Sequence, residues 1–198
     1  MFRHLFFGAF IVCQLLAIIS SNICRNLNYP MTRDILPQNR HKVKYLRYII
    51  NMKDKIKSIL FIVFPLVGGI IVSLLTNTKS YKAMLKPFLS PPAIVFPIAW
   101  TILYLLMGIS LYIVLKANKE MLKPFLIQLF INYLWPFIFF SLKKYVLSAI
   151  ILLLLIACVI DMIIKFYNTK KIAGILQFPY FIWLLFALYL NIGVAILN

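Results

Sequence analysis

The stretch SILFIVFPLVGGIIVSLL, Ser58–Leu75, has no charged residue and is long enough to cross the hydrocarbon core of a membrane as one helix. Further apolar runs of spanning length follow at Pro92–Leu115, Met121–Leu142, Tyr145–Ile164 and Ile172–Leu197. In hydrocarbon the backbone must satisfy its own hydrogen bonds, which a helix does within each run. The sequence therefore predicts an all-α integral membrane protein, a bundle of five transmembrane helices.

The overall composition supports lipid as the solvent. The 198 residues are 64% hydrophobic, 16% aromatic and only 13% charged, which is too apolar for a water-soluble domain of this size. Lysine and arginine number 21 against 4 acidic residues, giving a net charge of +17. The basic residues lie between the apolar runs and form no nucleic-acid motif. We interpret them as contacts with anionic lipid headgroups and expect no nucleic-acid partner.

The N-terminal region differs from the rest of the chain. Residues 1–24 hold an apolar run shorter than a membrane span, preceded by Arg3 and His4, which predicts a signal or targeting segment and leaves a sixth span as the alternative. Residues 25–57 form a basic, acid-poor extension, which is either part of an organelle address or an arm on lipid phosphates. Residues 58–198 form the predicted membrane domain. The expected location is a mitochondrial, plastid or endomembrane-system membrane.

The connections between the five runs are short, and each carries lysine. Connections of this length join neighbouring antiparallel helices, because a longer crossover has no chain to use. The sequence therefore predicts an up-and-down bundle.

Residues for hydrolytic or metal chemistry are missing from the spans. Asp161 is the only acid within them, and it precedes Lys165 by four residues, where the two can form an ion pair at the helix end. Both histidines, His4 and His41, precede the spans, and the three cysteines have no metal-type spacing. We therefore predict no catalytic residue and no metal site.

The three tryptophans occur one each in the second, third and fifth spans. Tryptophan in a membrane protein commonly lies at the lipid–water interface. Here each indole shares a helix face with a hydrogen-bonding residue three or four positions away, and such faces turned inward would line an apolar cavity with a few polar groups. The pairs are Trp100 with Tyr104, Trp135 with Asn132, and Trp183 with Tyr180.

Prolines stiffen the connection between the first two spans. Pro87 and Pro91 lie in this loop, and Pro92 stands where the second span begins, a position at which its missing N–H costs nothing. A stiff loop of this kind could cover a cavity at the end of the bundle.

Three motifs in order resemble the TspO/MBR family. Lys86–Gly108, KPFLSPPAIVFPIAWTILYLLMG, is similar to the family signature of KP, PP, a Trp and then LYxxMG. Gln128–Phe140, QLFINYLWPFIFF, resembles its QLxxNxxWxxxFF helix, and Pro179–Asn198 resembles its closing PYxxWxxFAxxLN pattern. The resemblance covers about residues 58–198 and leaves the N-terminal extension unexplained.

The resemblance implies a five-helix bundle, often a homodimer, whose cavity opens toward the first loop. It implies a membrane translocator or receptor for a planar hydrophobic ligand, a porphyrin such as protoporphyrin or haem, or a sterol such as cholesterol. No resident cofactor is expected, since the porphyrin is the ligand. By motif the ligand-binding residues are Trp100, Tyr104, Asn132, Trp135, Tyr180, Trp183 and Ala187, below Pro87, Pro91 and Pro92. Carboxylates of the ligand would meet Lys79, Lys82 or Lys86.

Two alternatives stay open beside this interpretation. One is a light-dependent porphyrin-degrading enzyme that uses Trp100 and Trp183, and the other is a regulatory membrane interaction protein. The chain also departs from the family: Ser80 and Leu89 stand where the loop usually has tryptophan, and the sterol-recognition pattern is absent from Leu190–Asn198.

Overall fold

The computed structural model of the protein describes residues 40–76 and 84–198. The chain forms two compact units, Met1–Lys53 and Asp54–Asn198. The expected targeting segment, residues 1–24, lies outside the described residues, as do Lys79 and Lys82. Helix α2, Arg40–Leu75, begins in the first unit and continues into the second.

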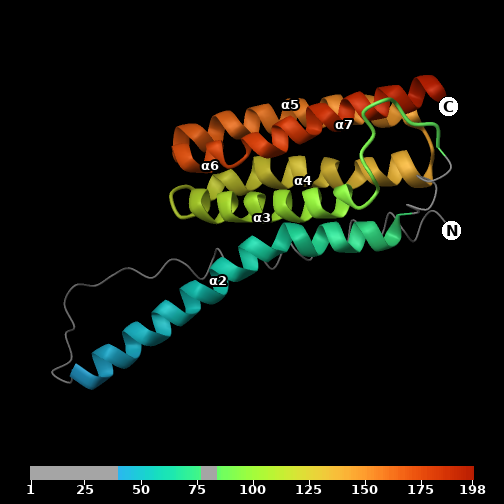
Figure 1. Ribbon diagram of the computed structural model, residues 1–198. Helices are drawn as coiled ribbons and strands as arrows, with labels where there is room; N and C mark the ends of the chain where they lie inside the picture. Colours follow the sequence, from blue (N-terminus) through green and yellow to red (C-terminus); the bar gives the residue numbers. More distant parts are fainter. Residues whose placement is uncertain (1–39, 77–83) are drawn as a thin grey trace. The chain divides into compact units, whose positions relative to one another are not determined.

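The second unit contains the membrane helices (Figure 1). Every regular element that the structure describes in it is helical. After the Asp54–Leu75 part of α2 come five α-helices and two short helical segments of other types. These are α3 (Val95–Leu115), the 3-10 turn η2 (Lys119–Met121), α4 (Leu122–Pro136), the π-helix η3 (Phe137–Ser141), α5 (Tyr145–Thr169), α6 (Lys171–Ile175) and α7 (Phe178–Leu197).

Five helical stretches in the described residues are long and apolar enough to cross a membrane. They confirm the five predicted spans, with shifted ends and with interruptions inside two of them. The fourth continues to Thr169 instead of ending at Ile164, so that Lys165 lies on the same helix as Asp161. Their bounds are Asp54–Leu75, Val95–Leu115, Lys119–Ser141, Tyr145–Thr169 and Lys171–Leu197.

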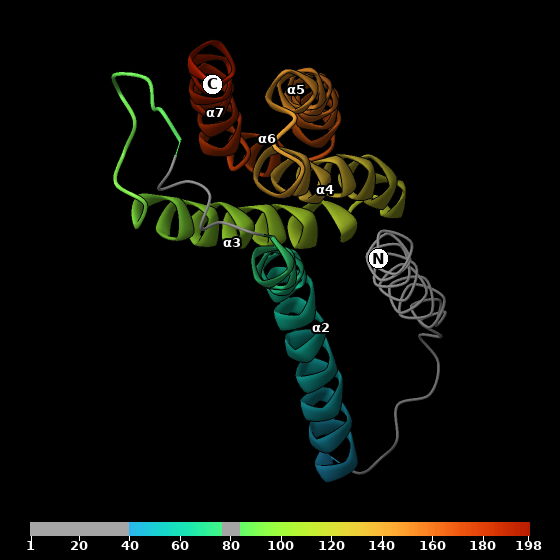
Figure 2. The same cartoon turned by 90° about the vertical axis from the view of Figure 1, so that its right-hand side faces the viewer.

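Helix α5 is the centre of the packing. It contacts α4, α6 and α7, while α3 contacts α4 and α6. In both views α5 and α7 lie side by side (Figures 1 and 2). Interior positions at helical spacing turn large apolar side chains toward these contacts, and such close packing drives helix association in lipid. The fully buried side chains include Met107, Leu111, Phe125, Leu152, Leu155, Met162, Phe166 and Leu184.

Two prolines interrupt the predicted spans. The last span was expected as one helix over Ile172–Leu197, but the structure divides it into α6 and α7 just before Pro179. Proline has no N–H to donate to the carbonyl four residues earlier, so the helix restarts there. Pro136 has a similar effect: the following turn is a π-helix, in which Leu142 N donates to Phe137 O at 3.1 Å.

Glycines allow α2 to approach α3 and α4 closely. A Cβ atom at Gly69 would overlap the Tyr104 ring, and one at Gly68 would overlap the ring of Tyr133. The Tyr133 hydroxyl donates a hydrogen bond of 2.7 Å to the Pro65 carbonyl of α2. Small residues at the contact and one interhelical hydrogen bond are typical of helix association in membranes.

The outward faces of the helices carry apolar side chains, as contact with lipid requires. Exposed examples are Ile59, Leu74, Ile98, Phe130 and Ile160.

The predicted ion pair on α5 is confirmed, with Lys165 Nζ 2.6 Å from Asp161 Oδ2.

Candidate ligand-binding site

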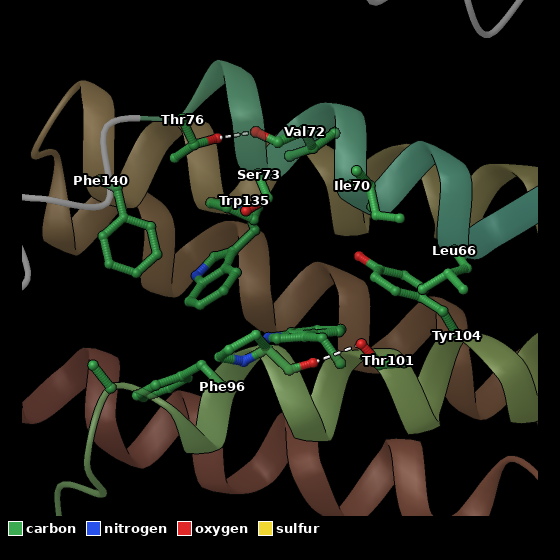
Figure 3. Close-up of a pocket in the computed structure, with 15 residues that line it drawn as sticks. Leu66, Ile70, Val72, Ser73, Thr76, Phe96, Thr101, Tyr104, Trp135 and Phe140 are labelled. Atoms are coloured by element: carbon green, nitrogen blue, oxygen red, sulfur yellow. Dashed lines mark hydrogen bonds between the residues drawn. The ribbon is translucent and has the colours of Figure 1, made fainter.

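A pocket of about 480 Å³ lies between α2, the beginning of α3 and the junction of α4 with η3 (Figure 3). Its volume is within the range of small-molecule sites, roughly 300–1,000 Å³. Trp135 and Phe140 stand together at one end, and Tyr104 and Leu66 lie at the other. The lining residues are Leu66, Gly69, Ile70, Val72, Ser73, Thr76, Ala93, Phe96, Pro97, Trp100, Thr101, Tyr104, Trp135, Pro136 and Phe140.

None of these lining residues carries a charge. Two of the four hydroxyl groups are already used within their own helices: Thr76 Oγ1 donates to Val72 O at 2.6 Å, and Thr101 Oγ1 donates to Pro97 O at 2.7 Å (Figure 3). The pocket therefore presents mainly aromatic rings and aliphatic groups, a surface suited to a flat apolar ligand.

The Tyr104 ring belongs to the pocket wall, but its hydroxyl group points into the bundle. The ring stacks on Trp100, with centroids 5.4 Å apart and planes inclined by 30°. The hydroxyl donates to Asn132 Oδ1 at 2.7 Å, and Asn132 Nδ2 donates to the Tyr180 hydroxyl at 2.9 Å. Tyr180 in turn donates to Gln128 Oε1 at 3.1 Å. This buried network joins α3, α4 and α7 directly behind the pocket.

Trp135 forms the opposite part of the wall. Its ring stacks on Phe139 at a centroid distance of 5.6 Å and meets Phe140 edge to face at 6.3 Å. Only 6% of Trp135 is exposed. The indole Nε1 lies 2.9 Å from the side-chain amide of Asn191 on α7. Tyr104 and Trp135 thus both turn a ring toward the pocket and a polar atom toward a buried asparagine.

The structure brings together part of the predicted set. Trp100, Tyr104 and Trp135 line the pocket. Asn132 and Tyr180 are completely buried one layer behind them, with their polar atoms engaged with each other and with Tyr104 and Gln128. They support the wall and present no exposed surface in this arrangement.

The other predicted residues are not part of the lining. Trp183 packs edge to face against Phe96, a lining residue, with ring centroids 6.2 Å apart. Ala187 is buried on α7. The three prolines, Pro87, Pro91 and Pro92, belong to the segment that leads into α3. Contact of these five residues with a ligand stays a prediction.

The described part of the first loop is attached to the end of α7. Pro87 lies so close to Gly193 that a Cβ atom there would come within 2.6 Å of the Pro87 Cβ. Leu85 N donates to Asn198 Oδ1 at 3.0 Å, and Asn198 Nδ2 donates back to Leu85 O at 3.0 Å. The Asn198 side chain therefore holds the backbone at Leu85, in the segment that leads to α3.

The sequence interpretation missed the contribution of α2. Leu66, Ile70 and Ser73 line the pocket, but an aliphatic helix gives no signal of a site. The adjacent glycines were the available clue, because Gly69 is where the Tyr104 ring meets α2. Gln128 and Asn191 were also missed, although a buried amide in a membrane span is unusual enough to be noted.

The described residues contain no group of three His, Cys, Asp or Glu side chains placed to hold a metal ion. The pocket wall consists mainly of aromatic rings and aliphatic groups, an arrangement suited to stacking and apolar contact.

The TspO/MBR family model matches residues 61–197, which include α3 to α7 and every pocket-lining residue of α2. The chain belongs to the TspO/MBR family. It is similar to the tryptophan-rich protein TspO of Archaeoglobus fulgidus, with 38% identity over 122 residues that cover 60% of this chain and 79% of the relative. It is also similar to the tryptophan-rich sensory protein of Cereibacter sphaeroides, with 33% identity over 128 residues, 64% of this chain and 81% of the relative.

A human relative is more distant. The human translocator protein is 30% identical over 118 residues, which cover 56% of this chain and 70% of the relative. The family match and the five spans make this TspO/MBR protein an integral, multi-pass membrane protein.

Proposed function

We propose that this TspO/MBR protein binds a planar hydrophobic ligand in the pocket between α2, α3 and α4, as a membrane translocator or receptor. A porphyrin such as protoporphyrin or haem is the first candidate, and a sterol is the second. The observation that carries the proposal is the uncharged pocket of about 480 Å³ with the stacked pair Trp100–Tyr104 on its wall. The relatives named translocator protein and tryptophan-rich sensory protein agree with a role in transport or sensing.

The shape and polarity of the wall favour a porphyrin ring. A flat macrocycle gains both apolar burial and stacking on indole and phenol rings, worth roughly 0.5–1.5 kcal/mol per aromatic pair beyond the buried area. Because no lining residue is charged, the propionate groups of such a ligand would remain at the pocket mouth, in water or among headgroups. Haem would bind without a histidine ligand, since both histidines of the chain precede the spans.

A fluorescence titration tests the proposal. Adding protoporphyrin IX to the protein in detergent should quench tryptophan emission with saturation, and Trp100→Ala should weaken the measured affinity about tenfold, because it removes the stacking surface. Phe130→Ala is the matched control, since Phe130 also lies in a span but is exposed on the outer face. A wild-type titration without saturation, or equal affinities for wild type and Trp100→Ala, would contradict the proposal.

The alternative enzymatic function needs a separate measurement. Trp100 is the predicted redox-active indole that lines the pocket, whereas Trp183 is one ring removed, behind Phe96. Loss of the Soret band of bound protoporphyrin under illumination, slowed in Trp100→Phe, would support degradation. A Soret band that stays unchanged under illumination at saturating protein would support binding without degradation. If no porphyrin or sterol raises the thermal stability, the regulatory function is favoured, because a ligand of the folded state must stabilise it.

A further inference from the structure

Asn191 is a buried polar residue in the C-terminal half of an apolar helix. It lies on α7 with 1% of its surface exposed, within the span Lys171–Leu197. A primary amide at this depth loses its hydrogen bonds to water and must replace them inside the protein. Its position is therefore set by the partners it can reach on neighbouring helices.

Three groups from two other helices surround the Asn191 amide. The Trp135 indole Nε1 on α4 lies 2.9 Å from one end of the amide, and the Tyr145 carbonyl on α5 lies 2.9 Å from the other. The Ser148 hydroxyl of α5 is 2.9 Å from the end that faces Trp135. The Ser148 hydroxyl also lies 2.7 Å from the Tyr145 carbonyl, and its single hydrogen can be donated to only one of these two oxygens. One side chain thus joins α4, α5 and α7.

Only one orientation of the amide satisfies these partners. The indole N–H is a donor only, so the Asn191 oxygen must face Trp135, and the Asn191 NH₂ group then faces the Tyr145 carbonyl, which is an acceptor only. The opposite orientation would place donor against donor and acceptor against acceptor. The indole N–H is consequently held by a defined hydrogen bond.

The other side of the same indole faces the pocket. Trp135 is a lining residue (Figure 3). Its neighbour Pro136 is the last residue of α4, and η3 follows directly. Trp135 is the last residue but one of α4, and the π-helical segment that follows it is of a kind frequent at functional sites. A hydrogen bond from behind is a direct way to fix the ring.

We propose that Asn191 is a positioning residue for the ligand pocket. Its hydrogen bond to Trp135 Nε1 fixes the orientation of the indole, so that a ligand meets the aromatic ring of Trp135 and no free N–H donor. The inference rests on the proposed ligand-binding function. It also specifies the ligand: the part that contacts Trp135 is an apolar ring or edge with no need of a hydrogen bond there. Tyr104, held by Asn132, presents its ring in the same way on the other wall.

The first test observes the indole directly and needs no ligand. The chain has three tryptophans, so the indole N–H region of a nitrogen–proton correlation spectrum has three signals to assign by single Trp→Phe substitutions. In wild type the Trp135 signal should exchange slowly with deuterium. In Asn191→Leu it should shift and exchange about tenfold faster or more, since the bond is lost. An unchanged Trp135 signal in Asn191→Leu overturns the inference.

The second test measures affinity for protoporphyrin IX. Asn191→Leu should weaken it about fivefold to tenfold, as the loss of one buried hydrogen bond that orders a wall residue suggests. In a Trp135→Phe background the same substitution should have no further effect on affinity, because the indole N–H is already absent. A full effect of Asn191→Leu in that background overturns the inference.

Ser110→Ala is the matched control. It removes a buried hydrogen bond, Ser110 Oγ to Ala173 O at 2.7 Å, that joins α3 to α6 and involves no lining residue. It should lower stability but leave both the Trp135 signal and the affinity unchanged. If Asn191→Leu does not fold, Asn191→Ser replaces it, because the shorter serine side chain cannot reach Trp135 Nε1 to form the hydrogen bond. A wild type that binds no protoporphyrin contradicts the proposed function, while the indole signal still decides the role of Asn191.

Discussion

The hydroxyl group of Tyr104 donates a hydrogen bond of 2.7 Å to the side-chain oxygen of Asn132, so the residue that stacks on Trp100 in the pocket is held from inside the bundle. The same amide donates to Tyr180, and neither Asn132 nor Tyr180 is exposed. The aromatic wall and the interhelical network are therefore one structure. Loss of the Tyr104–Asn132 bond is expected to act mainly on stability, because stacking on Trp100 also holds the Tyr104 ring in place.

Tyr104→Phe separates these two effects. The substitution keeps the ring but leaves Asn132 Oδ1 without its buried donor, so the protein should lose about 1–3 kcal/mol of stability while its affinity for protoporphyrin changes less than about threefold. Thermal unfolding and a titration of the same sample measure both. Tyr167→Phe, at an exposed position on α5, is the control and should change neither. Unaltered stability in Tyr104→Phe would show that the network contributes nothing.

Gly69→Ala tests the close approach of α2 to the pocket. The new Cβ atom would overlap the Tyr104 ring, so the ring or the helix must move, at a cost of about 1–3 kcal/mol. Both the stability and the affinity for protoporphyrin should fall. Val67→Ala, on the same helix at an exposed position, is the comparison that should leave affinity intact. Normal affinity in Gly69→Ala would mean that α2 does not form a wall of the site.

Asp161→Asn tests whether the only acid in the predicted spans has a function. Its ion pair with Lys165 is about half exposed, with 48% and 56% of the two side chains accessible, and such pairs contribute roughly 0–1 kcal/mol. We expect a stability change within that range and unchanged binding of protoporphyrin, measured by unfolding and titration. A large loss of affinity would assign the carboxylate to the site instead.

Lys143 is the one described residue other than glycine with a positive φ angle, at 53°. This conformation strains a residue with a Cβ atom, so Lys143→Gly should be neutral or stabilise the protein by up to about 1 kcal/mol, whereas Lys143→Val should destabilise it by a similar amount. Thermal unfolding of the two variants gives the comparison. A more stable Lys143→Val than Lys143→Gly would be incompatible with the turn between η3 and α5.

Most of the fold could be predicted because length and hydropathy alone determine membrane spans. All five appear where the apolar runs predicted them. The interruptions could not be predicted in detail. Pro136 and Pro179 were visible in the sequence. A π-helix follows Pro136, whereas the helix is divided before Pro179. Which of the two occurs depends on how the neighbouring helices satisfy the backbone carbonyls that the proline leaves without a donor.

The site could be predicted in part, for a different reason. Trp100, Tyr104 and Trp135 were predicted because they occupy aromatic positions of the family motifs, and all three line the pocket. The hydrogen bond between Trp135 and Asn191 was not foreseen, since it depends on how α4 and α7 rotate about their axes, which no local pattern specifies. Helix α2 offered only its adjacent glycines, Gly68 and Gly69, as a clue to its part in the site.

The most direct test of ligand binding in this pocket is a substitution on α2, a helix outside the three family motifs, that fills the pocket with a larger side chain. Ser73 lies on the exposed part of α2 and lines the pocket, so Ser73→Phe should occupy ligand space without disturbing the core. The equilibrium dissociation constant of protoporphyrin IX should rise about tenfold or more, with the unfolding temperature unchanged and Ser73→Ala close to wild type. Equal dissociation constants for Ser73→Phe and wild type would show that the ligand binds elsewhere.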